Sequence, residues 1–393
     1  MAERDAPTAP LDIATRLTRL GREADLCGPF ANPPVFHAST VLFDSVEEMQ
    51  SGRTRYKYGR RGTPTLEALE RALSDLDGAA GTVLCPSGLT AIAVAMMSAV
   101  SAGDHLLVTD NVYDPGRRFA DTVLARLGVE ITYFDPLAPI EPLFRANTRA
   151  VYVESPGSLT FEMSDVPAIA ALAHARGAKV IADNSWATPY FSQALGLGAD
   201  IVLMAATKYI GGHSDVMLGT VSANAACWPA LKSLHGSMGL CAGPDDVYLA
   251  LRGLRTLGVR LDHHRSSALK IAEWLGRRAE VGRVLHPALA SFPGHTLWRR
   301  DMRGSSGLFS FEPKGWTMQQ AAAFVDGLQL FGIGASWGGF ESLAILVDLR
   351  GSRSVRPRDP ASPLIRLHIG LEDADDLIAD LDRSFAAVAA AAG

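Results

Sequence analysis

Short apolar runs alternate with helical patterns through the middle of the chain, and this alternation constrains the fold more than any other feature. The runs are Gly81–Leu84, His105–Thr109, Glu130–Phe134, Ala150–Val153, Lys179–Ala182 and Asp200–Met204. Helical patterns lie between most of them, at Leu89–Val100, Gly116–Leu127 and Val166–Arg176. Strands that alternate with helices form a parallel sheet covered on both faces. The sequence therefore predicts an α/β domain built on such a sheet.

The first sixty residues lack this pattern. They are irregular and rich in Pro and Arg, with one candidate helix at Leu11–Leu20. A stretch this long without its own core is expected to lie across another surface, such as that of a second subunit. The alternative is a partly disordered tail.

The last third of the chain differs again. A long helical pattern begins after Arg255, and three candidate strands precede a final helix at Asp373–Ala390. These strands are Ser306–Phe311, Leu343–Val347 and Leu364–Ile369. They indicate a smaller α+β domain with an antiparallel sheet. The predicted parts are therefore an arm over residues 1–60, an α/β domain over 61–255 and an α+β domain over 256–393.

Composition excludes several classes of protein. The 37 Lys and Arg residues against 42 Asp and Glu residues give a formal net charge of −5, which does not suit a nucleic acid or an anionic membrane as partner. The longest apolar stretch, Ala91–Val100, is shorter than the ~18 residues of a membrane span. Met1–Ala14 has no apolar core of a secretory signal. The well-separated cysteines indicate reduced thiols and a cytoplasmic enzyme: Cys27, Cys85, Cys227 and Cys241.

Two polar residues follow predicted strands of the sheet. Asp183 ends one strand, at the edge where open α/β sheets bind ligands; a helix cap or a turn is the alternative. Lys208 follows another strand, where burial favours a neutral amine that can attack a carbonyl group. The alternative for Lys208 is a surface lysine whose stem packs and whose charge reaches solvent.

Three further positions suit ligand binding. Gly88 follows Ser87 at the start of an apolar helix, where free amides bind phosphate, or where Ser87 simply caps the helix. Tyr113 follows a strand and either stacks on a planar ligand or packs. Arg366 lies in an apolar strand and requires an anion, either a substrate carboxylate or a protein acid. Together, an acid, an amine, a phosphate cradle, a ring and a carboxylate fork are what pyridoxal phosphate (PLP) and an amino acid need.

Longer motifs along nearly the whole chain carry a family resemblance. They are Tyr58–Thr63, Glu154–Ser158, Ala206–Tyr209, Gly211–Asp215, Arg252–Leu257, Ser336–Ser342 and Arg366–Asp373. With these motifs the chain resembles the PLP-dependent enzymes of cysteine and methionine metabolism. The resemblance implies fold type I, the aspartate-aminotransferase-like architecture. It also implies a homotetramer of tight dimers with shared active sites, and a carbon–sulfur β-lyase that releases homocysteine, pyruvate and ammonia from L-cystathionine.

The resemblance also assigns roles to residues. Lys208 would carry the cofactor as a Schiff base and act as the catalytic base, with Tyr113 as a second catalytic group. The implied cofactor-binding residues are Lys208, Asp183 at the pyridine nitrogen, Tyr113 on the ring, Gly88, Leu89 and Thr207 at the phosphate, and Tyr58 and Arg60 from the neighbouring subunit. The implied substrate-binding residues are Arg366, Ser336, Trp337 and Tyr58. No metal is implied.

Some positions depart from the family pattern. Many relatives have Ser just before the Ala-Thr-Lys run, where this chain has Ala205, and the β-lyases carry an aromatic residue near Gly236. Relatives specific for γ-chemistry have Asn-Pro-Thr after the arginine of the arm and Glu before the Ser336 turn. This chain has Gly62 and Ala335 there, which favours the β-lyases. A γ-lyase or γ-synthase is the alternative, and a non-catalytic PLP-binding regulator is the alternative from another class.

Overall fold

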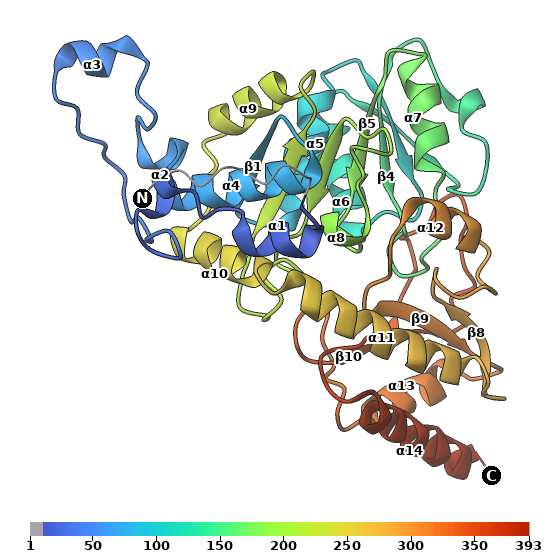
Figure 1. The fold of residues 1–393 in the computed structure, drawn as a ribbon. Helices are drawn as coiled ribbons and strands as arrows, with labels where there is room; N and C mark the ends of the chain where they lie inside the picture. The colour runs from blue at the N-terminus through green and yellow to red at the C-terminus, as the bar shows by residue number, and fades with distance from the viewer. Residues whose placement is uncertain (1–10, 393) are drawn as a thin grey trace.

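A computed structural model describes residues 11–392, and its centre is a seven-stranded sheet. The strand order is β1-β7-β6-β5-β4-β2-β3. Figure 1 labels β1, β4 and β5 of this sheet. The strands are β1 (Gly81–Cys85), β2 (His105–Thr109), β3 (Glu130–Phe134), β4 (Thr148–Glu154), β5 (Lys179–Asp183), β6 (Ile201–Met204) and β7 (Gly219–Ala223). The neighbouring strands β3, β2, β4, β5 and β6 pair in parallel, in that spatial order. Strand β7 is antiparallel to both of its neighbours, β1 and β6.

The predicted α/β domain with its large parallel sheet is confirmed, and the structure adds β7, which runs antiparallel to its neighbours and was not predicted as a strand. Its sequence, Gly-Thr-Val-Ser-Ala, has no apolar run. Its two hydroxyl side chains, Thr220 and Ser222, are nevertheless buried. Ser222 Oγ donates to Asp77 Oδ2 over 2.6 Å and pairs with Thr82 Oγ1 over 2.9 Å, so a buried hydroxyl with partners stands where a strand signal requires an apolar side chain.

Helices cover both faces of this sheet. They are α4 (Pro64–Asp77), α5 (Gly88–Ala99), α6 (Asp114–Phe119) with a π-turn at Ala120–Leu124, α7 (Val166–His174), α8 (Thr188–Phe191), α9 (Trp228–Ser237) and α10 (Pro244–Leu254). In β2, Leu106 and Val108 belong to the core beneath α5, while Leu107 belongs to the core beneath α7. Alternate residues of a strand point to opposite faces, so a continuous apolar run is what a sheet covered on both sides requires.

A smaller antiparallel sheet forms the C-terminal part, as predicted. It has the order β10-β11-β9-β8 and contains β8 (Val281–Leu285), β9 (Leu308–Pro313), β10 (Leu343–Val347) and β11 (Leu364–His368). The long helix α11 (Leu257–Leu275) leads into it, and α12 (His295–Asp301), α13 (Met318–Asp326) and α14 (Ala374–Ala392) complete it (Figure 1). Phe309, Phe324 and Phe385 lie in its separate core.

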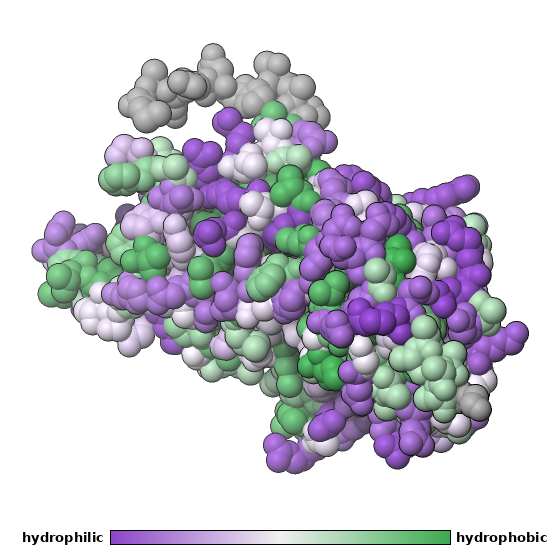
Figure 2. All heavy atoms as spheres, turned by 90° about the horizontal axis from the view of Figure 1, so that it is seen from below, coloured by the Kyte–Doolittle hydropathy of each residue, from purple (hydrophilic) through white to green (hydrophobic). Residues whose placement is uncertain are grey.

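The N-terminal arm contains α1 (Ile13–Arg19), α2 (Ala24–Cys27), α3 (Val46–Ser51) and a 3-10 turn at Gly59–Arg61. It first packs against α4 through its helices α1 and α2 and then extends away from the body around α3 (Figure 1). Apolar side chains on it are exposed to solvent: Phe30 by 74%, Leu42 by 89%, Val46 by 69% and Met49 by 63%. Hydrophobic surface is visible on this projection at the left of Figure 2. Such a surface is typical of an interface.

Residues 1–10 of the predicted arm, and most of the Met1–Ala14 segment, lie outside the described residues. Within residues 11–392, no helix is both long and apolar enough to cross a membrane.

Asp110, directly after β2, ties the loop between β10 and β11 to the large sheet. Its buried carboxylate accepts hydrogen bonds from the amides of Ser354, Val355 and Arg356 at 2.8–3.2 Å. Arg117 Nη2 donates to the same carboxylate over 2.6 Å. Burial opposes ionisation of Asp110, but these donors outweigh it and lower its pKa below the usual value. The carboxylate of Asp110 is therefore ionised, and its hydrogen bonds connect the large sheet to the loop of the C-terminal part.

We expect Asp110→Asn to lower the melting temperature, because the new amide hydrogens face three backbone donors and a guanidinium. The free energy of unfolding should fall by an amount on the order of 2 kcal/mol near neutral pH. A lowered carboxyl pKa stabilises the fold above the unfolded pKa, so the difference from wild type should shrink as the pH falls below about 4. Asp348→Asn in the same loop is the matched control, since Asp348 is largely exposed. Equal melting temperatures of all three proteins near neutral pH would contradict this account.

Candidate active site

Lys208 lies in the tight turn that follows β6. Its amide donates to Ala205 O over 3.0 Å, and its carbonyl accepts from Gly212 N over 2.7 Å. The half-buried side chain ends at the C-terminal part, where Nζ donates to Ser336 Oγ over 2.8 Å and lies 5.3 Å from the ring of Trp337. Burial, with a contribution from the positive charge of Arg366, lowers the pKa of Lys208 to about 8. About a tenth of this amine is thus free base at pH 7, far more than for a lysine with the ordinary pKa of about 10.4.

Two half-buried carboxyl groups face one another at the same sheet edge. Glu154 and Asp183 end the parallel neighbours β4 and β5 and are paired in register. Asp183 Oδ1 accepts from Ser185 N over 2.8 Å. Burial raises the pKa of Asp183, and burial together with repulsion by Asp183 raises the pKa of Glu154 well above its usual value. Such a pair is suited to bind a ligand that brings a positive charge.

Tyr113 is attached to this carboxyl pair through its backbone. Its amide donates to Glu154 Oε2 over 2.7 Å, and its side chain is 46% exposed at the start of α6. Burial of the phenol and the nearby charge of Glu154 raise the pKa of Tyr113, so the hydroxyl keeps its proton. The sequence analysis assigned no role to Glu154. A carboxyl at the end of a parallel strand, the signal used for Asp183, would have found it.

The start of α5 forms a cradle beside Lys208. Ser87 Oγ caps the helix by accepting from Thr90 N over 3.1 Å, and helical geometry leaves the amides of Gly88 and Leu89 without partners inside the helix. A Cβ on Gly88 would lie 2.7 Å from Ala205 Cβ, so this close approach requires glycine. Ala205 places a methyl group where its relatives' Ser would place a hydroxyl. The Thr207 hydroxyl donates to Leu218 O over 3.1 Å, so its single proton is engaged.

Arg366 is buried in β11 and has no carboxylate partner among residues 11–392. Its Nη2 donates to the carbonyls of Gly334, Ala335 and Ser336 at 2.9–3.3 Å, and its buried Nε has no partner within the same residues. Burial lowers the pKa of Arg366 to about 10. The guanidinium thus stays charged at neutral pH, fixed by a turn and with donor capacity left for an anion.

The comparisons with known proteins agree with this arrangement. The family described as "Cys/Met metabolism PLP-dependent enzyme" matches residues 14–386. The chain belongs to this family. It is therefore a PLP-dependent enzyme, as the sequence motifs predicted, and the alternative of a non-catalytic regulator is not retained.

Individual relatives cover nearly the whole chain. A putative cystathionine β-lyase of Rhizobium johnstonii is 52% identical, over 99% of this chain and 100% of the relative. The cystathionine β-lyase of Escherichia coli is 44% identical, over 96% of this chain and 98% of the relative. Among solved structures, cystathionine γ-synthase from Xanthomonas oryzae in complex with aminoacrylate and cysteine superimposes with a TM-score of 0.89 at 32% identity, covering 97% and 100%. This likeness confirms the predicted PLP-enzyme fold.

The residues at the sheet edge have the chemistry that the cofactor requires. The amine of Lys208, the carboxyl of Asp183 and the first amides of α5 match its aldehyde, ring nitrogen and phosphate respectively. The carboxyl pair lacks an ion-pair partner among residues 11–392, which a protonated ring nitrogen would supply. We therefore find that the cofactor fits this site, while the role of each residue stays a prediction.

Tyr58 and Arg60 do not join this site within one chain. Tyr58 is 48% exposed, and Arg60 Nη1 donates to Gly236 O over 3.0 Å. A Cβ on Gly236 would lie 2.6 Å from Arg61 Nη1, so an aromatic residue here would displace the arm's arginines. The glycine at position 236, where the β-lyases carry an aromatic residue, therefore makes room for the arginines of the arm.

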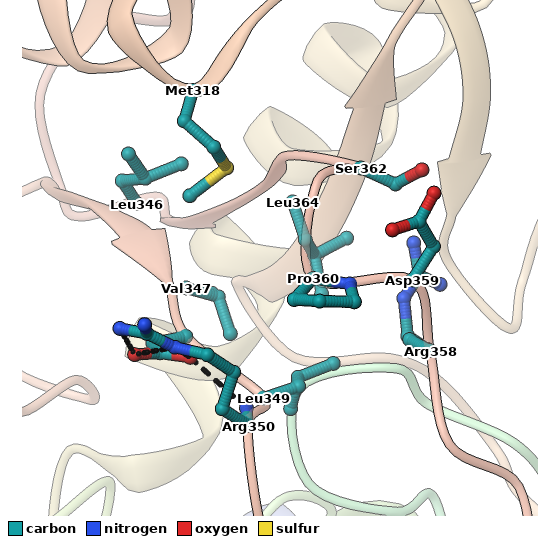
Figure 3. Close-up of a pocket in the computed structure, with 11 residues that line it drawn as sticks. Met318, Leu346, Val347, Leu349, Arg350, Arg358, Asp359, Pro360, Ser362 and Leu364 are labelled. Atoms are coloured by element: carbon teal, nitrogen blue, oxygen red, sulfur yellow. Dashed lines mark hydrogen bonds and ion pairs between the residues drawn. The ribbon is translucent and has the colours of Figure 1, made fainter.

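A separate pocket lies in the C-terminal part. A cavity of about 420 Å³ lies beside β10 and the loop before β11 (Figure 3). None of the predicted site residues lines it, and its two guanidinium groups are neutralised, since Arg350 pairs with Asp348 and Arg358 with Glu312. Within residues 11–392 no cluster of His, Cys, Asp or Glu could hold a metal ion.

The lowered pKa of Lys208 can be measured on the apoenzyme. We expect its reductive methylation, followed by peptide mass spectrometry across a pH series, to reach half its maximal rate near pH 8. Lys270, half exposed and paired with Asp375, supplies an internal reference from the same digest. A midpoint for Lys208 near the ordinary value of about 10.4 would show that the amine is well solvated.

Proposed function

We propose that this enzyme is a carbon–sulfur β-lyase that converts L-cystathionine and water into homocysteine, pyruvate and ammonia. The observation that carries the proposal is the amine of Lys208, held against Ser336 beside the charged fork of Arg366. A base and a carboxylate receptor thus meet at one point, as an α-amino acid requires. The similarity to cystathionine β-lyases supports the choice of substrate.

Each residue has a distinct task in this proposal. Arg366 binds the α-carboxylate of the substrate, with Ser336 and Trp337 at its side. Lys208 would hold the cofactor, and its Nζ, when free, would remove the proton from Cα of the substrate. When bound, PLP would supply the electron-withdrawing ring that makes this proton acidic. Asp183 would keep the ring nitrogen protonated.

The carbon–sulfur bond breaks at Cβ, and homocysteine leaves as a thiolate. Lys208, now protonated, is the nearest acid, and Tyr113 is the second candidate because its raised pKa keeps the phenol protonated. The remaining three-carbon fragment is hydrolysed to pyruvate and ammonia. Gly88, Leu89 and Thr207 hold the phosphate, although Thr207 must first give up its bond to Leu218 if its hydroxyl is to donate.

A γ-lyase or γ-synthase is the second candidate. The structural likeness to a cystathionine γ-synthase favours it. Against it, Lys208 has Arg366 as its neighbouring charge and no nearby carboxylate affects its pKa. The Glu typical of γ-specific relatives is absent from the turn, where Ala335 precedes Ser336.

We also propose a homotetramer of tight dimers with shared active sites. The exposed apolar arm would lie on a neighbouring subunit, where Tyr58 and Arg60 would reach the cofactor phosphate and the substrate. Phe30, Leu42 and Met49 are the side chains that such contact would cover. The four cysteines are free thiols, which suits the cytoplasm that we propose as the enzyme's location.

The products decide between the two candidates. We expect the PLP-loaded enzyme and L-cystathionine to yield pyruvate and homocysteine, identified by chromatography and mass spectrometry. Lys208→Ala should lose at least about 1000-fold in kcat, because the base is removed. 2-Oxobutanoate with cysteine would instead support the γ-lyase.

Shared active sites can be tested by mixing two defective subunits. Lys208→Ala and Arg60→Ala each impair their own homo-oligomers. In a mixed dimer, the intact Lys208 of one chain meets the intact Arg60 of the other, so one site is complete. Random reassortment after dissociation should restore about a quarter of the wild-type activity. No gain above the mean of the two separate variants would mean that each site is built from a single chain.

A further inference from the structure

Strand β11 presents two polar side chains on one face, towards the segment 334–339. Arg366 and His368 are two residues apart, so they point the same way. Arg366 Nη2 holds the carbonyls of Gly334, Ala335 and Ser336. His368 Nε2 lies 3.1 Å from Gly338 N and 3.1 Å from Gly339 O. One strand thus fixes both ends of this turn.

The turn is in direct contact with the backbone of Lys208. Gly338 has a φ of +87°, and a Cβ there would lie 2.9 Å from Lys208 C and from Tyr209 N. Two residues earlier, the Ser336 hydroxyl accepts from Lys208 Nζ. Because no side chain separates the turn from the lysine, a shift of Gly338 moves the Ser336 hydroxyl relative to the amine.

His368 acts here as a neutral hydrogen-bonding group. It is fully buried, and burial, together with the nearby His264, lowers its pKa well below the usual value. A neutral ring nitrogen either accepts from Gly338 N–H or donates to Gly339 O. His264 Nδ1 lies 2.7 Å from Ile369 O and therefore carries the proton there. Its ring lies 5.4 Å from that of His368.

We propose that His368 is a positioning residue for substrate binding, which holds the 336–339 turn so that Ser336 and Arg366 are correctly placed for the substrate's carboxylate. The proposal rests on the proposed carboxylate-binding role of Arg366. In this proposal His368 acts on the turn and not directly on the substrate or the cofactor. Its effect passes through Gly338 and Gly339, and the residues proposed to hold PLP belong mainly to the other sheet.

The test compares His368→Gln with His368→Asn in the PLP-loaded enzyme. The Gln amide can reach the position of Nε2, whereas the Asn amide is one methylene too short. L-alanine is the probe because it has a carboxylate but no leaving group, so its binding does not depend on cystathionine being the substrate. Its dissociation constant is measured from the change in cofactor absorption, and that of PLP by titration of the apoenzyme.

We expect His368→Asn to raise the dissociation constant of L-alanine at least about tenfold, the equivalent of one lost hydrogen bond. In His368→Gln this constant should stay within about threefold of the wild-type value. PLP affinity should stay within about twofold in both. His286→Asn is the control, because His286 is also a fully buried histidine but lies near Phe309, away from the turn.

Three results would overturn the proposal. One is unchanged L-alanine binding in His368→Asn, and another is an equal loss in the Gln and Asn variants. The third is an equal loss in His286→Asn, which would indicate general destabilisation. If L-alanine binding follows the prediction but cystathionine is not cleaved, the proposed function fails and the role of His368 stands.

Discussion

The active site depends on keeping one amine largely out of water. Lys208 would be fully protonated and unreactive near neutral pH if it were well solvated. Instead it lies in a turn closed by Ala205 and Gly212, beneath the ring of Trp337 and near the positive charge of Arg366. These surroundings come from both sheets, so the reactivity of the amine requires that the two parts of the chain be assembled.

The carboxyl groups at the same edge are subject to the corresponding constraint on negative charge. Glu154 and Asp183 are side by side because parallel strands in register end together. The same neighbouring strands that make the sheet thus force two acids into one volume, at a cost that a cationic ligand offsets. Glu154 also orders the backbone of Tyr113, so the acid pair and the ring proposed to stack on the cofactor are parts of one arrangement.

Local sequence patterns predicted the strands well where both faces of the sheet are apolar. The bounds of β2, β3 and β10 agree with the predicted ranges. Continuous apolar residues mark β2 and β10, whereas polar and apolar residues alternate at the start of β3. The strand β7 was not predicted, since it has no apolar run and its Ser222 hydroxyl is satisfied by Asp77 and Thr82, which lie far away in sequence.

The same limit applies to the site. Lys208, Asp183 and Tyr113 could be found because each follows a strand of the sheet. His368 could not, since an alternating apolar strand says nothing about which backbone amide its imidazole meets. The part played by Tyr58 and Arg60 requires a neighbouring chain, which no local pattern specifies.

The bond between Asp110 and the loop at Ser354–Arg356 also bears on how far the protein can be divided. A fragment that ends after the large sheet would keep Asp110 buried but lose the three backbone donors that stabilise its charge. In the α/β region the carboxylate would then be left with Arg117 as its charged partner, at the edge proposed for the cofactor site. Two sheets with separate cores therefore make a single unit for expression and for engineering, and exchange of the C-terminal part between relatives must carry the 354–356 loop with it.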